Sequence, residues 1–243
     1  MLKPCKFLLN ELVGISAGGN LAAAVAMRWR RLLQDSSAQL SGLYPIKLQF
    51  LMFPFLQAFN FSTNSYLLFQ HNGLNKLTTS GYVVSYLFGL TGQAHDNLTM
   101  ELYRNSHTTT TSRASFASIF AMDNETDKKE AAMAAKIRMD PKEFDPVGKS
   151  ELEGKLLPLV TNDEFSPLLA EDFRGVPATY LITGGMDVLR DDGAFFARRL
   201  RQSGQVSVVQ YRNYAQCDHH SWTSHIDLIE SDWIQFLDSN PVW

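Results

Sequence analysis

The sequence predicts an α/β protein in which a mainly parallel β-sheet is flanked by helices. Short apolar segments at Ile46–Phe53, Thr179–Thr183 and Val206–Tyr211 are typical of buried strands. Segments with helical character at Asn20–Gln34 and Gly193–Gln202 precede or separate these strands. Strands that alternate with helices in this way pair in parallel and are covered on both faces. A chain of 243 residues is long enough for one such domain.

The N-terminal part is predicted to contain a strand, a tight turn, a helix and a second strand. The first strand, Lys6–Val13, carries the polar residues Asn10 and Glu11 where a buried strand normally has apolar ones. The helix Asn20–Gln34 starts with small side chains, which allow close packing on a sheet. The second strand, Ile46–Phe53, is ended by a proline, which cannot continue the ladder.

A mostly helical insertion is predicted over residues 57–175, where strand and helix no longer alternate. Within it, Asp127–Met139 is rich in Ala and Lys, which favour helix, and a proline lies just beyond its end. The alternation resumes after the insertion. The helix Gly193–Gln202 is expected to close near Gly204, and Ser231–Leu237 is expected to form the last helix.

Composition excludes several classes of protein. A formal net charge of −3 gives no electrostatic basis for nucleic acid as a partner. No run of about 18 apolar residues occurs, so we expect no membrane span in this chain. The two cysteines, Cys5 and Cys217, are too few for a disulfide framework or a zinc site. A single bridge between them and two unpaired thiols both remain possible.

Three segments that follow strands carry residues suited to nucleophilic catalysis. Gly14–Gly18 (Gly-Ile-Ser-Ala-Gly) has the pattern of a nucleophile elbow, in which a serine sits on a sharp strand-to-helix turn. A serine hydroxyl is a weak nucleophile at neutral pH and needs a base that a third group orients. Asp187 follows the strand Thr179–Thr183 across a Gly-Gly turn, and His219 and His220 follow the last predicted strand. The chain order serine, aspartate, histidine is that of a hydrolytic triad.

Each of these elements also has a purely structural interpretation. A glycine-rich turn can bind phosphate, but the Gly-Lys-Ser/Thr of a P-loop is absent from the sequence. Asp187, Asp191 and Asp192 suit a turn or the start of a helix. A pair of histidines in a loop is usually at the surface. The order of the residues and their position after strands together favour a serine hydrolase.

Several segments resemble the hormone-sensitive-lipase family of α/β-hydrolases. Its nucleophile-elbow segment is similar to residues 14–21, and its Ser-Pro-Leu and Asp-x-Leu-Arg-Asp segments are similar to Phe165–Leu169 and Met186–Asp192. Within the family, Phe53–Phe59 and Trp233–Asp238 most resemble arylacetamide deacetylase-like proteins. The resemblance extends over nearly the whole chain, but over only the C-terminal part of the family's domain.

The resemblance implies roles for individual residues. Ser16 would be the nucleophile and Asp187 the carboxylate that orients the base. The family's histidine loop reads Gly-Phe-His-Gly, whereas this chain has Cys-Asp-His-His-Ser. Counting from the shared Asp-x-Leu-Arg-Asp segment places the base at His219 with a one-residue insertion, or at His220 with two. We prefer His219.

The resemblance also implies that the site is incomplete. The family's His-Gly-Gly-Gly segment, which donates backbone N–H groups to the oxyanion, does not occur in this sequence, and Ala17 N–H is the donor that can be assigned. We therefore expect an N-terminally truncated form: one partial α/β-hydrolase domain over residues 1–243, with residues 57–175 as a helical cap insertion.

The function predicted on this basis is a serine carboxylic-ester hydrolase acting on small lipophilic esters or arylacetamides, without a metal or organic cofactor. The absence of His-Gly-Gly-Gly favours an alternative, a catalytically silent hydrolase-like protein that binds a ligand or a partner. Family members are often membrane-anchored, so the resemblance implies the endoplasmic reticulum membrane or lumen, with the anchor absent from this chain.

Overall fold

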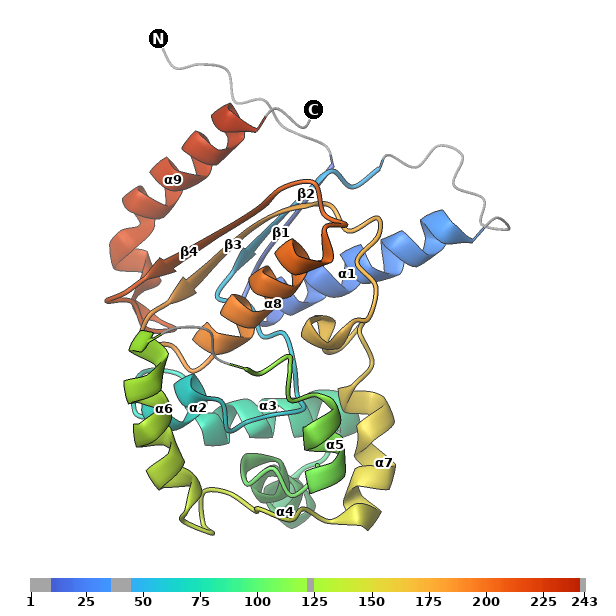
Figure 1. Ribbon diagram of the computed structural model, residues 1–243, viewed down its shortest axis with the longest axis vertical. Coiled ribbons are helices and arrows are strands. Elements are labelled where there is room, and N and C mark those ends of the chain that lie inside the picture. The colour runs from blue at the N-terminus through green and yellow to red at the C-terminus, as the bar shows by residue number, and fades with distance from the viewer. Residues whose placement is uncertain (1–9, 36–44, 122–124, 241–243) are drawn as a thin grey trace.

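A four-stranded parallel sheet forms the centre of the protein, with the strands in the order β1-β2-β3-β4. The computed structural model describes residues 10–35, 45–121 and 125–240. Helices lie on both faces of the sheet (Figure 1), which confirms the predicted fold class. The strands are β1 (Glu11–Ile15), β2 (Leu48–Met52), β3 (Ala178–Gly184) and β4 (Val209–Tyr214).

Two helices cover one face of the sheet and a third covers the other. Helix α1 (Ala17–Gln34) contacts β1 and β2, and α8 (Arg190–Ser203) contacts β3 and β4. On the opposite face, α9 (Ile226–Ser239) buries Ile229 and Phe236 against β2 and β3. These two residues are seven positions apart, so they lie on one face of the helix.

A separate group of helices occupies the connection between β2 and β3. In Figure 1 these helices lie beneath the sheet, at the carboxyl ends of its strands. We call this group, α2–α7 with the segments that join them, the helical layer. No strand occurs among the described residues of this connection. Its elements are α2 (Asn64–Leu68), α3 (Lys76–Phe88), α4 (Gly92–Tyr103), α5 (Thr110–Ser115), α6 (Glu125–Arg138) and α7 (Ser150–Val160), followed by the short 3-10 helix η1 (Pro167–Leu169).

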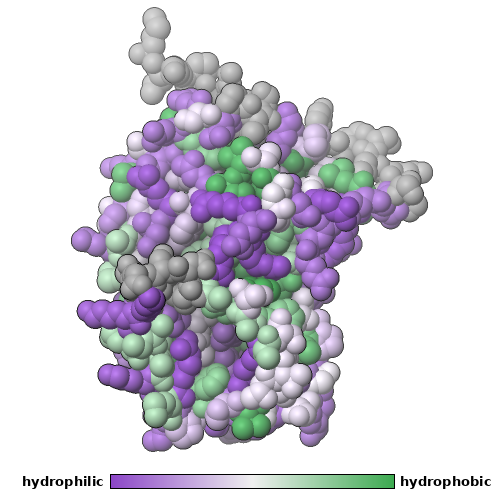
Figure 2. Space-filling model, viewed as in Figure 1, coloured by the Kyte–Doolittle hydropathy of each residue, from purple (hydrophilic) through white to green (hydrophobic). Residues whose placement is uncertain are grey.

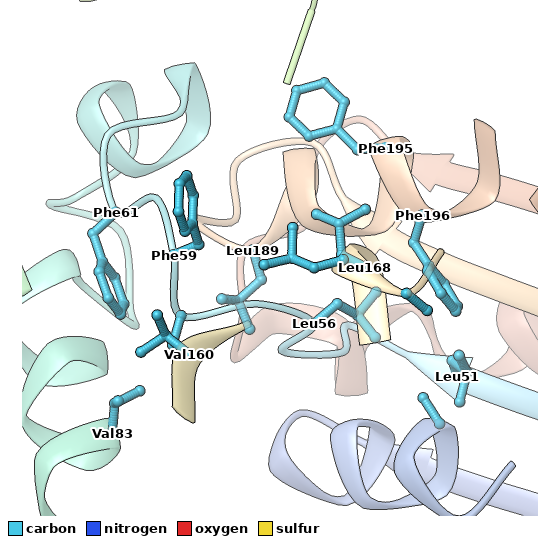
Figure 3. Packing of buried hydrophobic residues seen from close by; sticks show 14 of the residues in the cluster. Leu51, Leu56, Phe59, Phe61, Val83, Val160, Leu168, Leu189, Phe195 and Phe196 are labelled. Atoms are coloured by element: carbon cyan, nitrogen blue, oxygen red, sulfur yellow. The ribbon is translucent and has the colours of Figure 1, made fainter. Parts of the chain in front are cut away.

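The helical layer shares one hydrophobic core with the sheet. Leu51 of β2 and Phe196 of α8 belong to the same buried cluster as Val83 and Val160 of the layer. Figure 3 shows these side chains together with Leu56, which lies between the two groups. Because the core is continuous, the layer and the sheet stabilise each other.

Several predicted boundaries differ from the observed ones. The last strand was predicted at Val206–Tyr211, but β4 runs over Val209–Tyr214, because its register is set by backbone pairing with Thr179–Gly184 of β3 and not by its valines. Of the predicted strand Lys6–Val13, residues 6–9 lie outside the described part, and β1 continues to Ile15. Helices α1, α8 and α9 are longer than predicted.

Other predicted features can be compared directly with the structure. Gly204 ends α8 in a left-handed conformation (φ 64°), as expected. Cys217 is a buried free thiol, whose pKa is raised by burial, and Cys5 lies outside the described residues. Within the described ranges, no helix combines the length and apolar character needed to cross a membrane. Figure 2 shows hydrophilic and hydrophobic residues interspersed over one face of the molecule.

A buried histidine in the helical layer makes stability depend on pH. His107 is fully buried, and its Nε2 lies 2.9 Å from the carbonyl oxygen of Ala58. Burial lowers the pKa of His107 to about 4. The unfolded chain, with a pKa near 6.5, therefore takes up this proton first as the pH falls.

We expect the free energy of unfolding to decrease between pH 6.5 and pH 4 by roughly 3 kcal/mol through this group. His107→Gln keeps a donor for the Ala58 carbonyl but cannot titrate, so it should lose less stability on acidification than the wild type. Urea unfolding at pH 7 and pH 4.5 measures the difference. His71→Gln, at an exposed position, is the control, and equal losses in all three proteins would contradict the prediction.

Candidate active site

Ser16 lies at the sharp turn between β1 and α1, in a backbone conformation that residues other than glycine rarely adopt. Its φ and ψ are 54° and −120°, a conformation that costs on the order of 1–3 kcal/mol. Backbone hydrogen bonds hold it there. Ser16 N–H donates to Met52 O at 2.9 Å, and the Ser16 carbonyl accepts from Asn20 N–H at 3.1 Å. The hydroxyl thus stands at the carboxyl edge of the sheet.

Two glycines make this turn possible, and one of them lies outside the Gly-x-Ser-x-Gly pattern. A Cβ on Gly14 would lie 2.1 Å from the carbonyl oxygen of Gly18. A Cβ on Gly19 would lie 2.9 Å from Cβ of Pro54. Gly18 itself has nothing within 4 Å of the position of a Cβ. The close packing of the turn on itself and on Pro54 therefore requires glycine at positions 14 and 19. Gly18, the second glycine of the Gly-x-Ser-x-Gly pattern, has room for a side chain.

Asp187 reaches the site because the turn after β3 packs directly on the loop after β4. A Cβ on Gly184 would lie 2.5 Å from the carbonyl oxygen of Cys217, and one on Gly185 would lie 2.4 Å from that of Ala215. Met186 N–H also donates to Cys217 O at 2.9 Å. The Gly-Gly pair noted in the sequence thus brings the aspartate and histidine loops together.

The three side chains form one hydrogen-bonded row. Ser16 Oγ lies 2.8 Å from His219 Nε2, and His219 Nδ1 lies 2.9 Å from Asp187 Oδ2. The Asp187 side chain is fully buried, and its other oxygen accepts from Leu189 N–H at 2.9 Å. A hydroxyl, an imidazole and a carboxylate are thus arranged within hydrogen-bonding distance, which is the arrangement that nucleophilic catalysis by a serine requires.

The adjacent histidine occupies a different place. His220 is exposed, and its ring centre lies 5.5 Å from that of His219. No hydrogen bond joins its imidazole to Ser16 or Asp187 in the described structure. Its ring packs on Gly73, where a Cβ would lie 2.8 Å from His220 Nδ1. Of the two candidates from the sequence, His219 is the one brought to Ser16.

A pocket of about 550 Å³ opens beside Ser16. Helix α3 contributes Tyr82 and Tyr86 to the lining, and these side chains are 65% and 67% exposed. Most of the lining surface is apolar, and Ser16 and His219 are among the polar residues that line it. Within the described ranges, no group of three His, Cys, Asp or Glu residues is placed to hold a metal ion. The lining consists of Ser16, Ala17, Asn20, Leu21, Phe55, Gly73, Leu74, Thr78, Thr79, Tyr82, Val83, Tyr86, Phe165, Leu189, His219 and His220.

Comparison with known proteins identifies the family of this chain. A family model described as the alpha/beta hydrolase fold matches residues 11–138 and 97–223. The chain belongs to the α/β-hydrolase fold family. Arylacetamide deacetylase from Bos taurus is 34% identical over 199 residues, which cover 81% of this chain and 45% of that protein.

Other known proteins match over similar extents of this chain. Neutral cholesterol ester hydrolase 1 from Bos taurus is 26% identical over 238 residues, covering 93% of this chain and 54% of that protein. A solved α/β-hydrolase enzyme from the Lake Arreo metagenome aligns with 20% identity and a TM-score of 0.45, covering 87% of this chain and 42% of its own. The chain spans about half the length of the curated relatives that it matches.

Two residues that the sequence analysis missed shape this α/β-hydrolase site. Asp218 Oδ1 accepts from the N–H groups of His220 and Ser221 at 2.8 and 2.7 Å, which folds a tight turn around His219. Asn20 Nδ2 donates to the carbonyl oxygens of Phe55 and Phe165 at 2.9 and 2.8 Å, and so fixes two pocket segments to α1. The Asp-x-x-Ser spacing at 218–221 is a signal that could have revealed the first.

The glycine contacts predict an asymmetry within the elbow. Gly14→Ala should lower the free energy of unfolding by about 1–3 kcal/mol, because its Cβ collides with a backbone carbonyl. Gly18→Ala, in the first turn of α1, should leave stability unchanged or raise it by up to about 1 kcal/mol. Urea unfolding of both variants measures this. Equal destabilisation by the two alanines would contradict it.

Proposed function

We propose that this chain is a serine carboxylic-ester hydrolase whose catalytic residues are Ser16, His219 and Asp187. The observation that carries the proposal is the hydrogen-bonded row from Ser16 Oγ through His219 to the buried Asp187 carboxylate, beside a mostly apolar pocket that Ser16 and His219 line. The relatives named above are a deacetylase and an ester hydrolase, which supports the same reaction class.

The reaction follows from the order of the groups. Ser16 Oγ attacks the carbonyl carbon of the ester while His219 Nε2 takes the hydroxyl proton. Asp187 accepts from the Nδ1–H of His219, which keeps Nε2 facing the serine and stabilises the imidazolium that forms. The imidazolium then protonates the leaving alcohol or amine. Water, deprotonated by His219 in turn, releases the acyl group from Ser16.

Ala17 supplies an oxyanion donor in this proposal. It is the first residue of α1, so its N–H lies ahead of the first intrahelical hydrogen bonds and at the positive end of the helix dipole. One such donor contributes about 2.7–4 kcal/mol to the stabilisation of a tetrahedral intermediate. The N–H immediately follows the nucleophile, the usual position for this donor in a nucleophile elbow.

The pocket supports a small lipophilic ester or amide as the substrate. Its walls include Leu21, Leu74, Val83 and Leu189, which favour apolar groups by removing them from water. A pocket of about 550 Å³ falls within the range that holds a small organic molecule.

Labelling with a fluorophosphonate probe tests the proposal. The wild type should be modified at Ser16, and Ser16→Ala should not react. His219→Ala and Asp187→Asn should slow labelling by about 10⁴-fold, because the base is lost or held in the wrong tautomer. His220→Ala should slow it by less than about tenfold, since its imidazole makes no bond to the serine.

Two results would contradict the proposal. One is a folded, monodisperse wild type that never labels, and binding of apolar ligands by such a protein would favour the catalytically silent alternative. The other is a larger loss of labelling in His220→Ala than in His219→Ala.

A further inference from the structure

Three consecutive residues at the start of α8 bind three different segments of the connection between β2 and β3. Arg190, Asp191 and Asp192 follow Asp187 closely in the chain, and Arg190 N–H donates to the carbonyl oxygen of Asp187 at 3.1 Å. The helix that carries them therefore starts directly from the loop of the triad carboxylate.

Arg190 makes the most contacts of the three. Its guanidinium donates in a fork to Glu130 of α6, from Nη1 to Oε1 at 3.1 Å and from Nη2 to Oε2 at 2.6 Å. It also pairs with Asp191 Oδ1 through Nε at 3.0 Å, and its Cζ lies 4.9 Å from the centre of the Phe69 ring. The Arg190 side chain is only 13% exposed. Burial opposes its charge, but Asp191 and Glu130 outweigh this and raise the pKa of Arg190.

The same guanidinium reaches the turn that carries Asp187. Arg190 Nη1 donates to the carbonyl oxygen of Gly185 at 3.2 Å. From the other side, Gly185 N–H donates to Tyr214 O at 2.8 Å. The peptide groups just before Asp187 are thus held between the sheet and Arg190, and Arg190 is in turn held by α6.

The neighbouring aspartates attach the same helix end to other segments. Asp191 Oδ2 accepts from Ser65 N–H of α2 at 2.8 Å, and Ser65 Oγ donates to Val188 O at 2.7 Å. Asp192 Oδ1 accepts from Gln57 Nε2 at 2.9 Å. These contacts do not involve the carboxyl group of Asp187 or the carbonyl of Gly185, whereas the Arg190 fork links α6 directly to that turn.

We propose that Arg190 is a positioning residue that keeps Asp187 aligned with His219. Its hydrogen bond to the Gly185 carbonyl holds the turn that carries Asp187, and its fork to Glu130 makes this alignment depend on the position of α6. The role of this alignment in hydrolysis rests on the proposed function. The fork geometry matters, because a guanidinium binds both oxygens of Glu130 and still has an N–H directed at Gly185, whereas a lysine ammonium offers one point charge.

The test compares Arg190→Gln, Arg190→Lys and Glu130→Gln with a matched control. Glu151→Gln makes the same chemical change in an exposed ion pair with Lys155 on α7, also within the helical layer. Two readouts are measured: the low-field NMR resonance of the His219 Nδ1 proton bonded to Asp187, and the rate of Ser16 labelling by the fluorophosphonate. A displacement of about 1 Å in a catalytic group can cost about 100-fold in rate.

We expect Arg190→Gln to weaken or broaden the His219 resonance and to slow labelling by about 100-fold. Glu130→Gln should act in the same direction by about tenfold, and Arg190→Lys should recover part of the loss. Glu151→Gln should match the wild type in both readouts.

The inference would be overturned if Arg190→Gln and Glu130→Gln fold, keep an unchanged His219 resonance and label within about twofold of the Glu151→Gln control. If Arg190→Gln does not fold, Glu130→Gln decides, because it leaves the Arg190–Asp191 contact in place. A wild type that never labels would contradict the proposed function, yet the resonance would still show whether Arg190 positions Asp187.

Discussion

Parallel pairing of β1, β2, β3 and β4 is the constraint on which the rest of the structure depends. Because the strands run in one direction, the segments that leave β1, β3 and β4 emerge at the same edge of the sheet. Ser16 and His219 are separated by 203 positions in the chain, yet their side chains lie 2.8 Å apart. The strained conformation of Ser16 persists because β2 and α1 hold its backbone on both sides.

The helical layer lies at the same edge of the sheet and contributes residues to the pocket there. Asn20 lies one helical turn after Ser16 and fixes Phe55 and Phe165 by their carbonyl oxygens. Phe165 stacks on Tyr86 of α3, with ring centres 5.6 Å apart and planes within 8°. The wall of the pocket is therefore built outward from α1, the helix that follows Ser16, and movement of α3 relative to α1 would change the shape of the pocket.

The sequence was sufficient for features that depend on local pattern, and insufficient for those that depend on packing. Strand context and residue order were enough to select Ser16, Asp187 and the histidine loop, which the fold brings together. Spacing alone could not separate His219 from His220, because adjacent loop residues point apart and the turn around Asp218 decides their directions. The register of β4, the need for Gly19, and the pairing of Glu130 with Arg190 all arise from contacts between distant segments, which no local pattern records.

The electrostatics at the start of α8 explain how three carboxyl groups fit within six residues. Asp187 accepts a hydrogen bond from the imidazole N–H of His219, and Asp191 forms an ion pair with Arg190. For Asp192, burial and the nearby charges of Asp191 and Asp187 raise the pKa well above its usual value. Its Oδ1 accepts from Gln57 Nε2 at 2.9 Å, so the Asp192 carboxyl group is bound to the segment after β2 and not to the turn of Asp187. The carboxyl group that faces His219 is thus that of Asp187, while those of Asp191 and Asp192 are bound by Arg190 and Gln57.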